Sequence, residues 1–178
     1  MTVLNLETVD CERVDGVAWV TLNRPEALNA WIRQLGVDLH AAIDTAADDP
    51  EVRAIVVTGA GRAFSSGADL KAGGELQKEG GGFDVLTPLR EVYNPAILRV
   101  RTVPKPVIAA VNGPAVGIGC SLALAADLVI AARSSYFLLA FVNIGLGLDG
   151  GASQSLTARI GHARAMEMAM LGERIGAE

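Results

Sequence analysis

Two glycine-rich turns in this chain could present bare backbone amides to a ligand. They lie in GRAFSSGADL (61–70) and VNGPAVGIGCSLALAADL (111–128), and each follows an apolar run and leads toward helical sequence. Small residues in such turns let a ligand approach main-chain N–H groups closely. Two preorganised amides that hold one oxygen stabilise an enolate or oxyanion, with each donor contributing about 2.7 to 4 kcal/mol. The turns therefore predict an enzyme that handles acyl groups.

The elements that must position these turns can be read from the apolar pattern. Runs rich in β-branched residues predict strands at 17–22 and 52–59, separated by a helix-like segment at about 27–47. A strand at 106–111 then precedes the second turn, a short apolar helix near 119–126 and the runs DLVIAA and SYFLLA. The recurrence indicates an α/β fold of stacked ββα repeats.

Two further segments carry expectations of their own. The stretch AGGELQKEGGG (72–82) is glycine-rich, charged and aperiodic, which is typical of a mobile excursion that could cover a pocket. Near the end, Met166, Met170 and Leu171 share helical spacing, so we expect an apolar partner over that face.

Length and composition favour one domain over residues 1–178 and exclude several partners. The chain has 178 residues, of which 51% are hydrophobic and 20% charged, enough for one buried core. Its net charge of −5, with scattered Lys and Arg, disfavours nucleic acid. Cys11 and Cys120 lie far apart, and no stretch resembles a signal peptide or a membrane span. A cytoplasmic protein is the expectation.

Four blocks together resemble the crotonase, or enoyl-CoA hydratase/isomerase, superfamily. They are LNRPEALNA, GRAFSSGADL, KPVIAAVNGPAVGIGCSLALAAD and FVNIGLGLDGGASQSL, in the order and approximate spacing of that family. The resemblance implies a crotonase-like spiral of ββα units and a homotrimer or dimer of trimers. It implies acyl-CoA thioester substrates, with coenzyme A entering as part of the substrate and no separate cofactor. Family chains usually continue about eighty residues further, so the usual C-terminal helical region is expected to be missing.

The resemblance also assigns ligand-binding roles to positions of this chain. The two oxyanion amides fall on Ala68 and on Ile118, beside Gly117, and Ile118 brings a branched side chain where the family usually has a small one. The main chain at Ser66 and Leu70 matches positions that meet the adenine end of coenzyme A. Positions that line its pantetheine arm match Ala27 and Leu28.

The side chain that moves a proton decides the reaction. The two glutamates of family hydratases correspond here to Ser121 and Phe141, neither of which can act as a carboxylate base. Asp149 instead matches the aspartate of related enoyl-CoA isomerases, most closely the ring-epoxide isomerase group of phenylacetate breakdown. By its context alone, Asp149 is also a good candidate for a helix N-cap. The two roles are compatible.

We therefore predict an enoyl-CoA isomerase in which Asp149 is the acid and base and the Ala68 and Ile118 amides hold a thioester enolate. Other enolate chemistry, such as thioester hydrolysis or decarboxylation, is the enzymatic alternative. A noncatalytic acyl-CoA binder is the alternative from a different class.

Several other patterns compete with this interpretation. GLGLDG (145–150) satisfies the dinucleotide-binding pattern GxGxxG, although a tight turn before a helix is the simpler interpretation. His40 and His162 have neither a serine-triad motif nor metal-ligand spacing, so no metal is expected.

Three charged residues have structural interpretations. Asp69 is expected to cap a helix that begins near it, with a role as a site carboxylate as the alternative, and Asp127 to lie in a turn between a helix and a strand. Arg24 could meet a phosphate, but a strand-end residue that faces solvent is the more common outcome.

Overall fold

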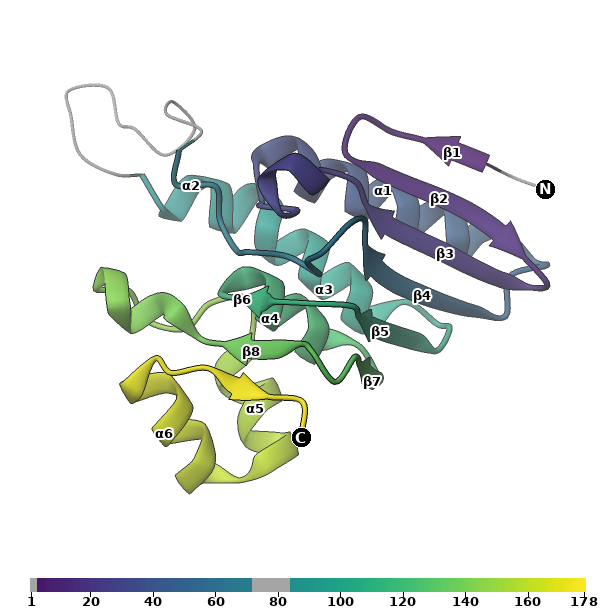
Figure 1. The fold of residues 1–178 in the computed structure, drawn as a ribbon. Coiled ribbons are helices and arrows are strands. Elements are labelled where there is room, and N and C mark those ends of the chain that lie inside the picture. Colours follow the sequence, from purple (N-terminus) through teal and green to yellow (C-terminus); the bar gives the residue numbers. More distant parts are fainter. Residues whose placement is uncertain (1–2, 72–83) are drawn as a thin grey trace.

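The computed structural model describes residues 3–71 and 84–178 and shows an α/β architecture (Figure 1). The described strands are β1 (Val3–Asn5), β2 (Val9–Val14), β3 (Val17–Leu22), β4 (Ala54–Gly59), β5 (Val107–Val111), β6 (Ala115–Val116), β7 (Leu128–Ala131), β8 (Tyr136–Leu138) and β9 (Ile175–Gly176). The described α-helices are α1 (Arg33–Asp48), α2 (Leu86–Pro88), α3 (Asn94–Thr102), α4 (Ile118–Ala125), α5 (Ala152–Ile160) and α6 (His162–Leu171). They are joined by the 3-10 helices η1 (Pro25–Ala27) and η3 (Ala140–Ile144) and by the π-helical η2 (Leu89–Tyr93).

The main sheet has the strand order β1-β2-β3-β4-β5-β7. Its first three strands are antiparallel, and β3, β4, β5 and β7 run parallel. The β3–β4 register is continuous from Val17 opposite Ala54 to Leu22 opposite Gly59. Parallel strands need crossover connections, which α1 supplies between β3 and β4. The ends of β4 and β5 that carry the two glycine turns therefore lie along one edge of the sheet.

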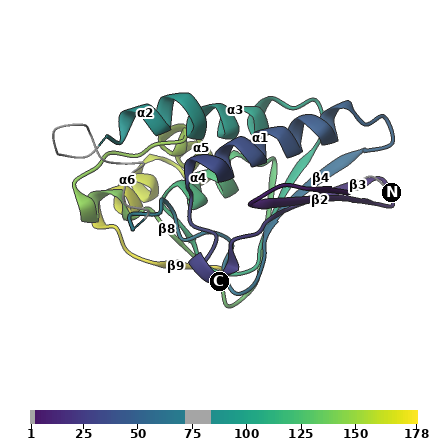
Figure 2. The ribbon, with the colours of Figure 1, turned by 90° about the horizontal axis from the view of Figure 1, so that it is seen from above.

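Helices α1 and α3 lie side by side over one face of the main sheet (Figure 2). On α1, the buried residues recur at helical spacing, including Leu35, Leu39, Ala42 and Ile43. They pack with inward-facing strand residues such as Val20 in the larger core. No helix in the described ranges is long and apolar enough to cross a membrane.

A second, smaller sheet follows the order β6-β8-β9 and packs with α4, α5 and α6 (Figure 1). Helix α4 packs between the two parts of the molecule. All eight of its residues are buried, and some belong to the larger hydrophobic cluster and others to the smaller one. On α6, Met168 is buried, whereas Met166, Met170 and Leu171 remain exposed. Within the described part of the chain, the apolar partner expected for that face is therefore not seen.

The predicted strands and helices correspond to β3, β4, β5, α4, β7, β8 and α6. The helix expected from residue 27 begins instead at Arg33. Pro25 starts η1, and Leu28 and Asn29 then adopt positive φ angles of 54° and 53°, which an α-helix cannot accommodate. The excursion expected at 72–82 lies outside the described residues.

Strand β2 and the helical run from α2 to α3 were not predicted. The residues VDCERV of β2 alternate, with Val9 and Cys11 buried, but three charged side chains obscure the pattern. Pro88 and Pro95 suggest breaks in the helical run, yet the run continues, with Pro95 in the first turn of α3 directly after the π-helical η2.

Candidate active site

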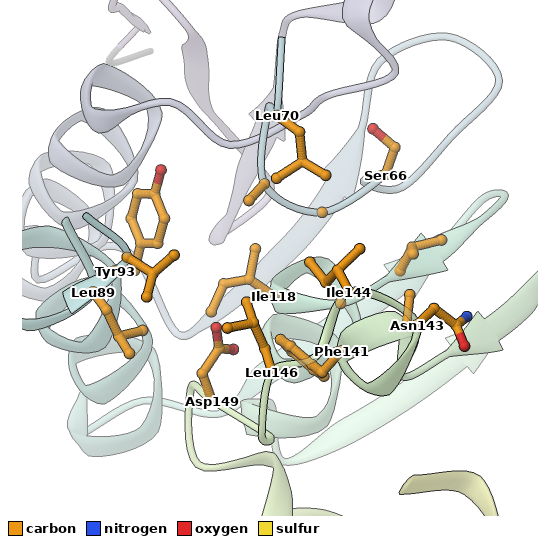
Figure 3. Close-up of a pocket in the computed structure, with 16 residues that line it drawn as sticks. Ser66, Leu70, Leu89, Tyr93, Ile118, Phe141, Asn143, Ile144, Leu146 and Asp149 are labelled. Carbon is orange, nitrogen blue, oxygen red and sulfur yellow. The ribbon is translucent and has the colours of Figure 1, made fainter. Parts of the chain in front are cut away.

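A cavity of about 180 Å³ opens beside the two glycine turns (Figure 3). Four stretches of the chain surround it, and most of their contributing residues are apolar. The described lining residues are Ser66, Gly67, Ala68, Leu70, Val85, Leu89, Tyr93, Val116, Gly117, Ile118, Ala140, Phe141, Asn143, Ile144, Leu146 and Asp149. Of the site residues predicted from the sequence, all except Ala27 and Leu28 therefore line one cavity.

The first glycine turn holds the amide of Ala68 toward this cavity. The N–H of Trp31 donates to the Gly67 carbonyl at 2.7 Å, and the N–H of Asp69 donates to the Trp31 carbonyl at 2.8 Å. These bonds make a parallel bridge between Trp31 and Ala68. In such a bridge the central residue directs its own N–H and C=O away from the partner segment. The Ala68 N–H has no acceptor among the described residues.

The second turn places the amide of Ile118 at the start of α4. Gly117 immediately before it has φ 52° and ψ −124°, a conformation that glycine adopts without a Cβ clash. The first N–H groups of a helix have no acceptor within the helix, and that of Ile118 has none elsewhere in the described chain. Hydrogen bonds from Ser65 to Pro114 and from Val116 to Ser65, at 3.0 and 2.9 Å, join the two turns. The arrangement can direct both amides at one ligand oxygen.

Asp149 supplies the one carboxyl group among the described lining residues. Figure 3 shows this group pointing into the cavity near Ile118 and Leu146. Its Oδ1 is buried and has no hydrogen-bond partner in the described chain. Desolvation by burial raises the pKa of Asp149 from 3.8 to about 6. A carboxyl group in this state is suited to proton transfer near neutral pH.

The helix-capping interpretation of Asp149 is wrong. Helix α5 begins after Gly151, which has a left-handed conformation, and no side chain caps its first turn. Asp149 takes part through its main chain instead: its carbonyl oxygen accepts the N–H of Ala152 at 2.9 Å and the hydroxyl of Ser121 at 3.1 Å. The backbone is thereby held, while the carboxyl group has no hydrogen-bond partner among the described residues.

The positions matched to the hydratase glutamates lie at or beneath the same cavity. Ser121 is fully buried on α4 and bonds the turn that carries Asp149. Phe141, on η3, is 6% exposed and forms part of the cavity wall. The side chain of Ile118 also faces the cavity, where it narrows the space beside the amide (Figure 3).

The residues matched to coenzyme A contacts divide into two groups. Ser66 and Leu70 line the cavity, and Leu70 is 56% exposed at its rim. Ala27 and Leu28 do not line it, but they lie directly behind Ser66. The N–H of Ser66 donates to the Leu28 carbonyl at 2.9 Å, and its hydroxyl donates to the Ala27 carbonyl at 3.3 Å.

One wall of the cavity was missed in the sequence. Val85, Leu89 and Tyr93 come from the helical run that was not predicted. Their four-residue spacing is a helical signal that could have revealed this face. Tyr93 packs edge-on against Trp31, with ring centroids 5.2 Å apart, so this wall is tied to the segment that bridges Ala68.

The competing motifs do not form sites in the described structure. The GxGxxG pattern follows the 3-10 helix η3 instead of the strand that a dinucleotide site requires. His40 approaches Asp44 on the same helix. No three His, Cys, Asp or Glu side chains gather at metal-binding distance in the described ranges. Burial raises the pKa of both cysteine thiols, that of Cys120 to about 12, which leaves them unreactive.

The expectation that Arg24 faces solvent is wrong. It is partly buried and pairs with Asp69 at 3.2 Å. The Asp69 carboxylate also accepts the N–H of Lys71 at 3.1 Å, while residues that could form a helix beyond it lie outside the described ranges. The prediction for Asp127 is confirmed, since it lies in the bend between α4 and β7 and accepts the N–H of Val107 at 2.9 Å.

Comparisons with known proteins agree with this geometry. The sequence pattern of the enoyl-CoA hydratase/isomerase family matches residues 12–178. A probable enoyl-CoA hydratase from Rhodobacter capsulatus is 46% identical over 175 residues, which is 98% of this chain and 65% of that protein. The 1,2-epoxyphenylacetyl-CoA isomerase of Escherichia coli is 42% identical over 163 residues, or 92% of this chain and 62% of that protein.

Solved structures show the same fold. An enoyl-CoA hydratase from Bacillus anthracis superposes with a TM-score of 0.88 at 31% identity, covering 96% of this chain and 65% of that one. One from Mycobacterium avium subsp. paratuberculosis gives a TM-score of 0.84 at 40% identity, covering 97% and 64%. The chain thus spans a little less than two thirds of these proteins, and the expected crotonase-like fold is confirmed.

Proposed function

Because the chain belongs to the enoyl-CoA hydratase/isomerase family, we propose that it is an enoyl-CoA isomerase that shifts a double bond through a thioester enolate. One observation carries the proposal. Among the described residues around the cavity, a single carboxyl group lines the same cavity as two residues whose backbone amides have no acceptor.

The proposed reaction needs one proton shuttle. The Asp149 carboxylate removes a proton from the α-carbon of a 3-enoyl thioester, and the electron pair moves toward the thioester oxygen. The Ala68 and Ile118 amides donate to that oxygen, where negative charge develops. The carboxyl group then returns the proton to the γ-carbon as the electron pair moves back, which leaves the double bond next to the thioester. Atoms and charge balance without an added water.

The surroundings of Asp149 favour isomerisation over hydration. Hydration requires one group to activate water and another to protonate carbon. Ser121 and Phe141 occupy the positions where the resemblance places the two hydratase glutamates, and neither supplies a carboxylate. The apolar side chains of Leu89, Leu146 and Phe141 beside the carboxyl group also disfavour an attacking water (Figure 3).

Coenzyme A enters this proposal as part of the substrate, with no separate cofactor. The main chain at Ser66 and Leu70 would contact its adenine end, and Ala27 and Leu28 its pantetheine arm. Hydrogen bonds from Ser66 to the carbonyls of Ala27 and Leu28 place these two residues next to the first glycine turn. This position supports a path for coenzyme A along both segments. By the same resemblance, the proposed assembly is a homotrimer or a dimer of trimers.

The test is incubation with a 3-enoyl-CoA in deuterated buffer, followed by NMR and mass spectrometry. We expect the double bond to migrate and deuterium to enter the product. Asp149→Asn should lower turnover by at least about 100-fold, because the amide cannot accept the proton, while acyl-CoA binding persists. Asp48→Asn, at an exposed position on α1, is the matched control. Undiminished turnover in Asp149→Asn would remove this residue from the mechanism, and binding without exchange in the parent would favour a noncatalytic binder.

A further inference from the structure

The ion pair between Arg24 and Asp69 is buried more deeply than a surface ion pair. The two side chains are only 17% and 15% exposed, and the guanidinium nitrogens lie 3.2 and 3.3 Å from one carboxylate oxygen. The pair joins segments 45 residues apart in sequence. Asp69 directly follows Ala68, whose amide faces the cavity. A carboxylate thus lies in sequence beside the group proposed to hold the enolate.

Contacts around this pair close into a ring. The Arg24 guanidinium also donates to the Ala30 carbonyl at 2.5 Å. The backbone N–H of Arg24 donates to the side-chain oxygen of Asn29 at 2.9 Å. The next residue, Trp31, bridges Ala68 through bonds to Gly67 and Asp69. The path from Arg24 through Ala30, Trp31 and Ala68 to Asp69 therefore returns to the guanidinium.

We propose that Arg24 is a positioning residue that aims the Ala68 amide and neutralises the Asp69 carboxylate beside it. This inference rests on the proposed function, since it assigns Arg24 a role in stabilising the enolate. Asp69 orders the turn through Lys71 and Trp31, but its charge opposes a second negative charge nearby. Pairing with the Arg24 guanidinium keeps the turn ordered and reduces the repulsion between the Asp69 carboxylate and the enolate.

The opposite charges of Arg24 and Asp69 predict an unequal response to the two single substitutions. Arg24→Gln removes the guanidinium from the Asp69 carboxylate, which both loosens the turn and disfavours the enolate. Asp69→Asn retains one side-chain oxygen, which can still accept from either Arg24 or Lys71, and it adds no negative charge, so its effect should be smaller. The double variant that combines Arg24→Gln with Asp69→Asn carries no charge on either side chain. We therefore expect it to recover part of the activity that Arg24→Gln loses.

Turnover and substrate affinity distinguish this role from general support of the fold. For Arg24→Gln we expect kcat to fall by about 10- to 100-fold, less than or similar to the loss of one oxyanion donor. KM should change by less than about threefold, because the interaction strengthens only as charge develops. Adding Asp69→Asn should restore kcat by at least about threefold.

Binding of a saturated acyl-CoA, isotopically labelled at the thioester carbonyl, gives a readout that does not depend on turnover. Hydrogen bonds from the two amides should lower the infrared stretching frequency of this carbonyl. We expect a smaller shift in Arg24→Gln and a larger one again in the double variant. Arg13→Gln is the matched control, because Arg13 pairs with Asp49 at 3.3 Å with similar exposure but lies away from the cavity.

The failures of the two proposals are distinguishable. A bound ligand with an unshifted carbonyl in the parent protein would overturn the oxyanion site, and this inference with it. A parent shift that persists unchanged in Arg24→Gln would overturn the role of Arg24 alone. If Arg24→Gln does not fold, Asp69→Asn decides the matter: a loss of kcat as large as that of Asp149→Asn would contradict the milder effect expected.

Discussion

Asp149 shows how one residue acquires chemistry from its surroundings. Its main chain is held by Ser121 and Ala152, while its carboxyl group lies against apolar side chains with Oδ1 unpartnered in the described structure. Desolvation raises the pKa of this group to about 6. An ordinary aspartate is a weak base at neutral pH, and the shift brings its affinity for protons closer to that required for removal of a proton from carbon.

The pH dependence of the reaction follows from that environment. The carboxylate form is the base, so kcat/KM for 3-enoyl-CoA isomerisation should rise with pH through about pH 6 and level off above pH 7. At pH 5 it should be about tenfold below the plateau. Initial rates in buffers of constant ionic strength measure this profile. A rate that is constant from pH 5 to 7.5 would exclude a base with this pKa.

At the scale of elements, the site depends on how closely the turn before α5 approaches α4. Ile118 and Ser121 lie one helical turn apart on α4, and both contact this turn. A Cβ added at Gly150 would lie 2.8 Å from atoms of each, and Gly150 also has a φ of 55°. The glycine therefore permits the approach that brings Asp149 beside α4, where its carbonyl oxygen accepts the Ser121 hydroxyl.

Gly150→Ala should disturb this junction. We expect a loss of about 1 to 3 kcal/mol in unfolding free energy from overpacking and the strained φ, together with lower isomerase turnover. Urea unfolding and initial rates measure the two effects. Gly147→Ala is the matched control, because no atom lies within 4 Å of its added Cβ and its φ is not in the left-handed region. Equal stability of the two variants would contradict the close contact.

At the scale of the whole molecule, the buried carboxylate lowers stability. The pKa of Asp149 is about 6 in the folded chain against an ordinary value of 3.8, so the folded state binds more protons between these values. Stability therefore falls as pH rises from about 4 to 6 and stays lower above that range. The cost falls on a carboxyl group that makes no hydrogen bond to the described part of the chain.

Asp149→Asn should consequently be more stable than the parent at pH 7 by about 1 to 3 kcal/mol, because the amide carries no charge to desolvate. The difference should shrink to a few tenths of a kcal/mol near pH 3.5, where the aspartate is mostly protonated in both states. Chemical unfolding at the two pH values measures it, with Asp48→Asn as the exposed control. A variant less stable than the parent at pH 7 would indicate that the carboxylate has a stabilising partner.

Much of the architecture follows from local patterns. The strands at β3, β4 and β5, the short helix α4 and both glycine turns were predictable, because burial on a pleated strand or a helix leaves a periodic trace. Strand β2 and the run from α2 to α3 escaped prediction, since charged residues and prolines obscured that periodicity. The wall formed by Leu89 and Tyr93 was therefore missing from the predicted site.

The sequence by itself determined the ingredients: turns that can expose amides at residues 68 and 118, one aspartate at 149 where hydratase carboxylates are absent, and an α/β arrangement to carry them. Tertiary structure decided their use. The Asp149 side chain does not cap α5 and is desolvated by burial. Arg24 pairs with Asp69, although a solvent-exposed arginine was expected. Burial and pairing depend on which distant segments pack together, and the local spacing of residues does not record that.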